Sequence, residues 1–540
     1  MEEKTASILG TLREYGETTS AHGIPRAVTT KSVPRRLFWT CLFLASFSYF
    51  CCQAYDLVNK YIDYPVTTDI KIQWSELEFP AVTICNANPL RFSKLLRLGH
   101  EGFQNAGFIP RPAKTSQGNQ GKAQGGPFQQ AQPTTVPSPT TTATTKATTA
   151  DYDSADDDDY DYDYDDHHED FKTANTFMGL IANLNSSTRQ AIGHQARDFI
   201  QECQFDGRAC SPKNFSIFTD STYGNCFTFN KASGNTAPQS ATSAGPLNGL
   251  SLILYIEQEE YIPSLTEKAG VRVVVHSPAR WPFPEFEGFD AAPGFLTSAG
   301  LRLTSITRLG GRYGDCTNGG GYELLYPGTY TQTNCLVTCQ QQHMVRVCGC
   351  ADPSLRAPGN TTFCDSTTTS VDCKNRVRRE IVTGVLACTC PASCSDKVYG
   401  KAIGLSEWPA DSYLTNVLTK LQTKKGRRPG TAILGDTDRF KRNLLKLNIY
   451  YEALNYEKIS ESPGYEEESL LGDLGGQLGL WVGMSLLSAM EILEIFADLF
   501  AILCKKISSK EMKSSKKVDV APYDKKTAYN NLSLTFKGKM

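Results

Sequence analysis

The chain has 540 residues, of which 21% are charged, and a formal net charge of −2. These averages are typical of soluble proteins, and we expect no nucleic-acid partner. They hide two apolar runs, one near each end of the chain.

Residues 1–36 form a short N-terminal arm, and the first apolar run follows at 37–57. Lys31, Arg35 and Arg36 precede the run, which places the arm on the cytoplasmic side of a membrane. The run begins late and lacks a small-x-small cleavage site, so we interpret it as a transmembrane helix and not as a cleaved signal peptide. Residues 58–473 are then extracellular.

Composition changes abruptly at residues 104–170. A Gly/Gln/Pro-rich stretch leads into a Thr-rich segment and then into an Asp-rich one with interleaved tyrosines. Such sequence cannot bury a core, so we predict a disordered insert. Its role is either that of a tolerated, solvated loop or that of a negatively charged antenna for cations.

The sequence predicts ordered structure again from Phe177 onwards, and its apolar residues have helical periodicity as far as Cys203. The segments 77–85, 250–257, 271–276, 301–309 and 447–454 are rich in apolar and β-branched residues, which predicts strands. Strands so far apart in sequence predict one large α/β domain.

The extracellular region holds fourteen of the eighteen cysteines, and the other four are Cys41, Cys51, Cys52 and Cys504. An even number there predicts disulfides, with a zinc module as the alternative. Cys335 and Cys339 share a helix face, and Cys388 and Cys390 share a strand face, so a helix stapled twice to a returning strand fits both spacings. Asn185, Asn214 and Asn360 head acceptor triplets for N-glycosylation, whereas Asn531 should stay bare in the cytoplasmic tail, 504–540.

The second apolar run, 474–503, contains three carboxylates. Glu491, Glu494 and Asp498 fall within an arc of roughly 60° on one helix face. A carboxylate at the bilayer centre costs about 2.5–3.5 kcal/mol, which predicts that the stripe faces an aqueous cation pathway. The alternative is that the membrane run ends near Met490. Lys505, Lys506, Lys510 and Lys513 follow and place the C-terminus inside the cell.

Several motifs in order resemble the degenerin/epithelial sodium channel superfamily, which includes acid-sensing and peptide-gated channels. They are His22-Gly23, the run from Phe79 to Asn86, Ala292-Pro-Gly-Phe295, the cysteine module 316–394, Tyr451 to Tyr456, and Leu471 to Ser485.

The resemblance implies an α/β membrane protein with two transmembrane helices per subunit, assembled as a trimer. It implies an α+β ectodomain of palm, finger, thumb, knuckle and β-ball, with the insert in the finger region and 316–394 as the thumb. It also implies the disulfides Cys85–Cys226, Cys203–Cys210, Cys316–Cys394, Cys335–Cys390, Cys339–Cys388, Cys348–Cys373 and Cys350–Cys364.

The same resemblance assigns site residues. Gly483-Met484-Ser485 matches the Gly-x-Ser selectivity filter, where glycine lets the backbone present carbonyl groups to a small cation. The alternative is that Gly483 only allows two helices to cross closely and has no role in a filter. Glu491 and Glu494 match cation-attracting positions, His22-Gly23 matches an inner-pore pair, and Tyr313 matches an aromatic residue that couples gating to the first span.

Gating is the open part of the prediction. Acid-sensing members carry histidines where this chain has Tyr64 and Pro65, which argues against proton gating. Arg376 to Arg379 matches a basic cleavage pattern, yet it lies inside the cysteine module and more simply covers a helix surface. We favour gating by an amidated Arg-Phe neuropeptide, partly because an acidic surface suits a cationic peptide. The alternatives are a proton-gated, a constitutively open or a mechanically gated sodium channel.

We therefore predict a plasma-membrane, homotrimeric, amiloride-sensitive sodium channel whose partners are sodium ions, an extracellular peptide, amiloride-type blockers and lipid. A cell-surface receptor or adhesion protein is the non-channel alternative. The chain lacks a Gly-x-Ser-x-Gly elbow, an H-E-x-x-H motif and a phosphate loop, so we expect no enzyme, catalytic residue, cofactor or metal site.

Overall fold

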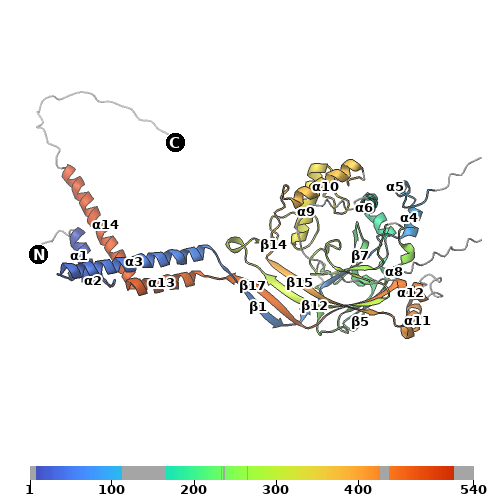
Figure 1. Ribbon diagram of the computed structural model, residues 1–540, viewed down its shortest axis with the longest axis horizontal. Coiled ribbons are helices and arrows are strands. Elements are labelled where there is room, and N and C mark those ends of the chain that lie inside the picture. The colour runs from blue at the N-terminus through green and yellow to red at the C-terminus, as the bar shows by residue number, and fades with distance from the viewer. Residues whose placement is uncertain are drawn as a thin grey trace, which may run out of the picture. The chain divides into compact units, whose positions relative to one another are not determined.

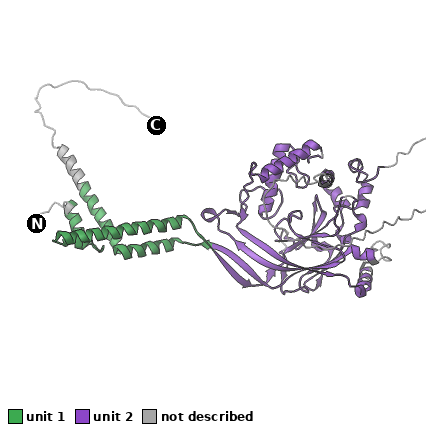
Figure 2. Cartoon of the chain, in the orientation of Figure 1, with its two compact units in different colours: residues 1–67, 462–540 green, residues 68–461 purple. Residues whose placement is uncertain are grey.

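The structure is a computed structural model that describes residues 8–111, 166–425 and 437–515, apart from 233, 235, 236, 264 and 366. The chain divides into two compact units (Figure 2). The helical unit comprises residues 1–67 and 462–540, and the disulfide-rich unit comprises residues 68–461. The part of the predicted cytoplasmic tail beyond residue 515, with Asn531, lies outside the described residues.

The helical unit is formed by both ends of the chain. Its helices are α1 (Ile8–Thr18), α2 (Ile24–Thr29), α3 (Val33–Ile62), α13 (Glu467–Val482) and α14 (Leu486–Ser515). The long helix α3 contains the whole of the predicted span 37–57 and has a proline in its first turn, where the missing N–H costs nothing. Among the described helices, α3 alone is long and apolar enough to cross a membrane.

The predicted second span divides into two helices. Residues 474–482 belong to α13, which begins before the predicted boundary, and α14 begins at Leu486. The three carboxylates lie in α14, and their charge is the reason that this helix does not match a simple apolar span.

Two sheets form the centre of the disulfide-rich unit (Figure 1). The eight-stranded sheet has the order β1–β17–β12–β16–β9–β4–β5, and β15 pairs with β12. Its strands are β1 (Val66–Trp74), β4 (Ile200–Phe205), β5 (Arg208–Ala209), β9 (Leu250–Tyr255), β12 (Phe295–Thr307), β15 (Ser395–Glu407), β16 (Leu444–Tyr451) and β17 (Asn455–Pro463). The five-stranded sheet has the order β11–β10–β3–β7–β6. Its strands are β3 (Ala81–Asn86), β6 (Phe215–Asp220), β7 (Gly224–Phe229), β10 (Val271–His276) and β11 (Phe289–Ala291).

The largest hydrophobic core joins these two sheets. Ile84 and Phe227 of the five-stranded sheet belong to the same buried cluster as Leu252 and Leu447 of the eight-stranded sheet. All five predicted strand segments overlap observed strands, but the predicted helical stretch is wrong at its end, because residues 200–203 begin β4. An irregularity in the strand register between Ile200 and Glu202 lets both Ile200 and Cys203 join this core, which a helical period does not anticipate.

Short helices form a second core beside the sheets. They are α4 (Phe92–Leu98), α5 (Glu101–Asn105), α6 (Asp166–Ala182) and α7 (Ser186–Ile192), whereas α8 (Ala196–Phe199) joins the main core through Phe199. The predicted boundaries of the disordered insert, 104 and 170, are wrong. Phe108 and Ile109 are buried against Phe177, and α6 already begins at Asp166. Residues 112–165, the rest of the insert, lie outside the described residues.

The cysteine module consists of two helices, α9 (Gln332–Cys348) and α10 (Thr368–Val382), flanked by β13 (Cys316–Thr317) and β14 (Ala392–Ser393). Its five disulfides are Cys316–Cys394, Cys335–Cys390, Cys339–Cys388, Cys348–Cys373 and Cys350–Cys364, and Cys85–Cys226 and Cys203–Cys210 lie outside it. These seven pairs are the ones that the family resemblance implies. One detail differs: Cys388 and Cys390 precede β14 and lie in no strand, because no neighbouring strand pairs with them.

The remaining elements are short. They are β2 (Leu77–Glu78) paired with β8 (Ser240–Ala241), the helices α11 (Leu414–Lys425) and α12 (Thr437–Asn443), and the 3-10 turns η1 (Pro212–Asn214), η2 (Gln258–Glu260), η3 (Gly311–Tyr313) and η4 (Asp411–Tyr413). Both α11 and α12 pack on β9 and β16 through a small apolar cluster that includes Val417, Leu421 and Phe440.

Candidate pore and ligand sites

The predicted filter lies where the chain leaves helical geometry. Gly483 ends α13 in the left-handed conformation, at φ 68° and ψ 25°, and its N–H donates to the carbonyl of Gly479 at 3.1 Å. Ser485 directly precedes α14, and its N–H donates to the Ser488 hydroxyl in the first turn of that helix at 3.0 Å. Residues 483–485 therefore form a break between two helices, and glycine suits the first position because a Cβ is strained there.

A loop from the N-terminal arm packs directly on this break. The His22 N–H donates to the carbonyl of Val482 at 3.0 Å. A Cβ built on Gly483 would lie 2.2 Å from the His22 ring, closer than real side-chain atoms approach. Gly23 follows at φ 89° and allows α2 to start beside α3. The structure thus brings His22 and Gly23 together with Gly483, although more than 450 residues separate them in sequence.

The same loop binds the first carboxylate of α14. One oxygen of Glu491 accepts hydrogen bonds from the Thr19 hydroxyl at 3.3 Å, the Ser20 N–H at 3.2 Å and the Ser20 hydroxyl at 3.3 Å. The Ser20 hydroxyl also contacts that of Ser488, which is fully buried. Charge-assisted bonds of this kind are stronger than neutral ones. We name this contact between residues 19–20 and Glu491 the Glu491 latch.

The other two carboxylates of the stripe have exposed side chains on α14. Within the part of the chain that the structure describes, neither Glu494 nor Asp498 has a hydrogen bond or ion pair. The stripe therefore holds two kinds of carboxylate, one tied to the N-terminal loop and two accessible. The sequence pattern gave no signal for this division, because the partners of Glu491 lie in a distant segment.

Aromatic contacts join α3 to α13. The rings of Tyr49 and Trp481 lie 4.5 Å apart in an edge-to-face arrangement. At the far end of α3, the Tyr61 hydroxyl donates to Glu467 at 3.0 Å, and the Lys60 ammonium lies 4.4 Å from the Tyr465 ring centre. Sequence reasoning missed these contacts, although aromatic residues at helix ends are typical of membrane interfaces.

The three predicted glycan acceptors have exposed side chains. The Asn185 carbonyl oxygen caps α7 by accepting from the Thr188 N–H at 2.7 Å, and that of Asn214 accepts from the Ser211 N–H at 2.9 Å. Both bonds use the oxygen, so the amide nitrogen that carries a glycan is not engaged by them. Tyr313 is half-buried at the end of η3, three residues before Cys316. Glycosylation and the gating role of Tyr313 stay predictions.

A cavity of about 580 Å³ lies between α6, the five-stranded sheet and α10. Its apolar lining includes Phe177, Met178 and Leu265, and its polar lining includes Glu285 and Arg378. Burial, reinforced by the nearby carboxyl of Asp220, raises the pKa of Glu285 to about 7. A hydrogen bond from Thr222 opposes this shift. Sequence reasoning missed the cavity, because its walls come from seven separate segments.

A buried polar contact next to this cavity joins α6 to α10. The Lys374 ammonium donates to the Asn175 carbonyl oxygen at 2.6 Å and lies 3.9 Å from the carboxylate of Asp352. Asp352 is completely buried and also pairs with Arg378 at 2.9 Å. We name this contact the Lys374 joint. Because both charges of its central pair are shielded from water, its geometry links the position of α6 to that of α10.

Comparison with known proteins supports the resemblance. A family model described as amiloride-sensitive sodium channel matches residues 15–495. An epithelial sodium channel subunit alpha from Neoceratodus forsteri is 29% identical over 528 residues, which cover 90% of this chain and 78% of that protein. An epithelial sodium channel subunit gamma from Xenopus laevis is 30% identical, covering 89% of this chain and 79% of that protein. A human gamma subunit is 28% identical, covering 92% and 83%.

Proposed function

This chain belongs to the amiloride-sensitive sodium channel family, and on that premise we propose that three copies form a ligand-gated, sodium-selective pore in the plasma membrane. In this proposal α3 and the α13–α14 segment cross the bilayer, and both termini lie in the cytoplasm. The disulfide-rich unit is then the extracellular domain.

The observation that supports the pore most strongly is the break at Gly483 with the N-terminal loop packed on it. Backbone that leaves a helix at membrane depth is tolerated only where it is covered by protein or lines a water-filled path. Here His22 covers one side of the break. In a threefold assembly, residues Gly483, Met484 and Ser485 of each copy would form the narrow part of the path, and backbone or hydroxyl oxygens would replace water around sodium.

The division of the carboxylate stripe gives each acid a distinct role. Glu494 is the better candidate for a cation-attracting ring, because its side chain is exposed. Glu491 is half-buried and instead holds the N-terminal loop against the break. Asp498 lies one turn further along α14 and fits an inner vestibule.

For gating we propose an amidated Arg-Phe peptide that binds the cavity between α6 and α10, the finger and thumb of the family resemblance. Phe177, Met178 and Leu265 offer an apolar wall to the phenylalanine ring, and Glu285 offers a carboxylate to the arginine. A cation beside Glu285 also favours its ionised form. Proton gating is the second candidate, supported by the raised pKa of Glu285.

The Lys374 joint supplies a route from that cavity to the disulfide-stapled helices. A ligand shifts a channel toward its open state only if it binds that state more tightly. Ligand that contacts Met178 and Arg378 bridges α6 and α10, and the five disulfides make the module a rigid lever. Tyr313, close to the Cys316–Cys394 disulfide, is the proposed contact toward the first span.

The experiment that tests the function is expression of this chain alone in oocytes, with peptides, pH steps and amiloride applied in sodium and in potassium solutions. An amiloride-blocked sodium current in response to an amidated Arg-Phe peptide supports the proposal. A sodium current on acidification alone supports the proton-gated alternative, and a current at rest supports a constitutively open channel. Absence of any current, with the chain present at the cell surface, contradicts a homomeric channel.

A further inference from the structure

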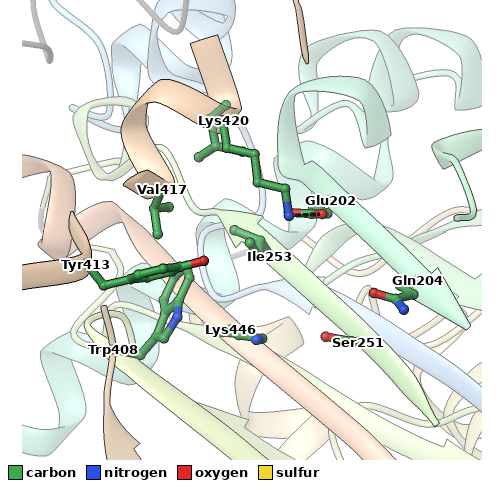
Figure 3. A pocket seen from close by; sticks show the side chains of 10 residues that line it. Glu202, Gln204, Ser251, Ile253, Trp408, Tyr413, Val417, Lys420 and Lys446 are labelled. Atoms are coloured by element: carbon green, nitrogen blue, oxygen red, sulfur yellow. Dashed lines mark ion pairs between the residues drawn. The ribbon is translucent and has the colours of Figure 1, made fainter. Parts of the chain in front are cut away.

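A second pocket lies on the outer face of the eight-stranded sheet, beneath α11 (Figure 3). The floor of the pocket is formed by residues that are paired across three neighbouring strands. Glu202 of β4 pairs with Ile253 of β9, and Ile253 pairs with Lys446 of β16. Lys446 alternates with the buried residues Leu445 and Leu447, so its side chain is on the face opposite the main core.

Three charged side chains line this pocket, and they are Glu202, Lys420 and Lys446. The Lys420 ammonium, from α11, pairs with Glu202 at 2.7 Å. Lys446 stands two strands away from Glu202, a separation of about 10 Å between strand axes, with Ile253 between them. Within the described residues, the side chain of Lys446 has no hydrogen bond or ion pair. The Lys446 ammonium therefore places a positive charge on the pocket floor.

The other walls are aromatic and apolar. In Figure 3 the Lys446 ammonium lies between the Trp408 indole and the Ser251 hydroxyl, while Tyr413 and Val417 stand above it. The pocket has a volume of about 100 Å³. A cavity of about 150 Å³ accepts benzene, so this pocket fits a smaller organic molecule.

We propose that this pocket binds a small monocarboxylate of about two to four carbons. The carboxylate accepts hydrogen bonds from the Lys446 ammonium, and the carbon chain packs against Trp408 and Val417. The Ser251 hydroxyl borders the site but donates its proton to the side-chain oxygen of Asn448 at 2.8 Å. Lys446 supplies the charge, and the aromatic wall favours an organic acid over an inorganic anion. This site is separate from the proposed pore and from the cavity at Glu285. Ligand binding to it can therefore be tested without measuring ionic current.

The test is thermal unfolding of the detergent-solubilised full-length chain in sodium propionate against equal concentrations of sodium chloride. We expect propionate to raise the unfolding midpoint in a saturable way. Lys446→Met should require roughly tenfold more propionate for the same rise, because a charge-assisted hydrogen bond is lost. Lys446→Arg, which keeps the charge, should retain most of the effect.

Lys401→Met is the matched control, because Lys401 is an exposed lysine on β15 of the same sheet. If Lys446→Met yields no folded protein, Lys446→Gln takes its place. The proposal is overturned if propionate does not shift the wild type, or if Lys446→Met responds like Lys401→Met. A Lys446-dependent shift of equal size in chloride would show an inorganic anion site and would also overturn it.

Discussion

Gly483 is the residue on which the pore proposal depends most. Its left-handed backbone and the contact with His22 each disfavour a side chain. We expect Gly483→Ala to reduce sodium current per surface channel strongly, since the conformation alone costs about 1–2 kcal/mol and the methyl group displaces the N-terminal loop. Current normalised to surface expression measures this effect. Gly472→Ala in α13 is the control, because a Cβ there meets nothing within 4 Å. Equal currents in the two variants would contradict the proposed packing.

Glu491 and Glu494 should respond differently to loss of charge. Glu494→Gln removes an exposed charge and should lower single-channel conductance without changing the N-terminal loop. Thr19→Val combined with Ser20→Ala removes the side-chain hydrogen bonds of the Glu491 latch and should instead alter open probability. Single-channel recording separates the two quantities. Identical effects of the two changes would show that the latch has no role of its own.

Glu285 gives the disulfide-rich unit a pH dependence of stability. Its pKa is raised to about 7, so the native state keeps a proton that the unfolded chain releases near pH 4.5. Between these two values the contribution of Glu285 to the free energy of unfolding therefore falls as pH rises. We expect Glu285→Gln to flatten the dependence of the thermal midpoint between pH 4.5 and about 7. Glu267→Gln, an exposed acid of the same cavity, is the control, and an unchanged profile for Glu285→Gln would refute the assignment.

At the scale of elements, the Lys374 joint fixes α6 to α10. Lys374→Met leaves Asp352 buried with Arg378 as its remaining charged partner, beside two hydrogen bonds from Ser354. We expect a loss of about 3 kcal/mol of stability, near the lower end for breaking a buried pair, together with weaker activation by peptide. Thermal unfolding and peptide dose–response curves measure the two effects. Arg379→Met, at an exposed position of α10, should leave both nearly unchanged. Wild-type peptide sensitivity in Lys374→Met would exclude the joint from gating.

Elements differ in how well the sequence predicted them. The strands were predictable because β-branched and apolar residues such as those of Val271–His276 form local patterns. The ends of the insert were not, because Phe108 and Ile109 are ordered by Phe177, which is distant in sequence. The sequence also did not predict that Cys388 and Cys390 lie outside any strand, since a strand forms only where a neighbouring strand pairs with it.

In the candidate site, too, features that depend on residues distant in sequence could not be predicted. The carboxylate stripe and the Gly-x-Ser pattern are local features, so they were recognisable in the sequence. The Glu491 latch, the cavity at Glu285 and the pocket at Lys446 are made by segments far apart in the chain, and no periodicity or spacing marks them. The family resemblance supplied the disulfide pairs, which spacing alone leaves open.

At the scale of the whole molecule, the proposal requires three copies around one axis. A homotrimer should have three times the mass of the 59.4 kDa chain, apart from glycan and detergent. Mass photometry of the solubilised protein, with and without enzymatic removal of glycans, measures this ratio. A stable monomer or dimer would contradict the assembly. Glycan on Asn531 would contradict the topology, because that residue is placed inside the cell.

The most direct test of the central claim is the reversal potential of the current that this chain carries when it is expressed alone. With an amidated Arg-Phe peptide present, we expect reversal near the sodium equilibrium potential and a large negative shift when external sodium is replaced by potassium. A current whose reversal potential does not change on that replacement would contradict a sodium-selective pore at Gly483–Ser485.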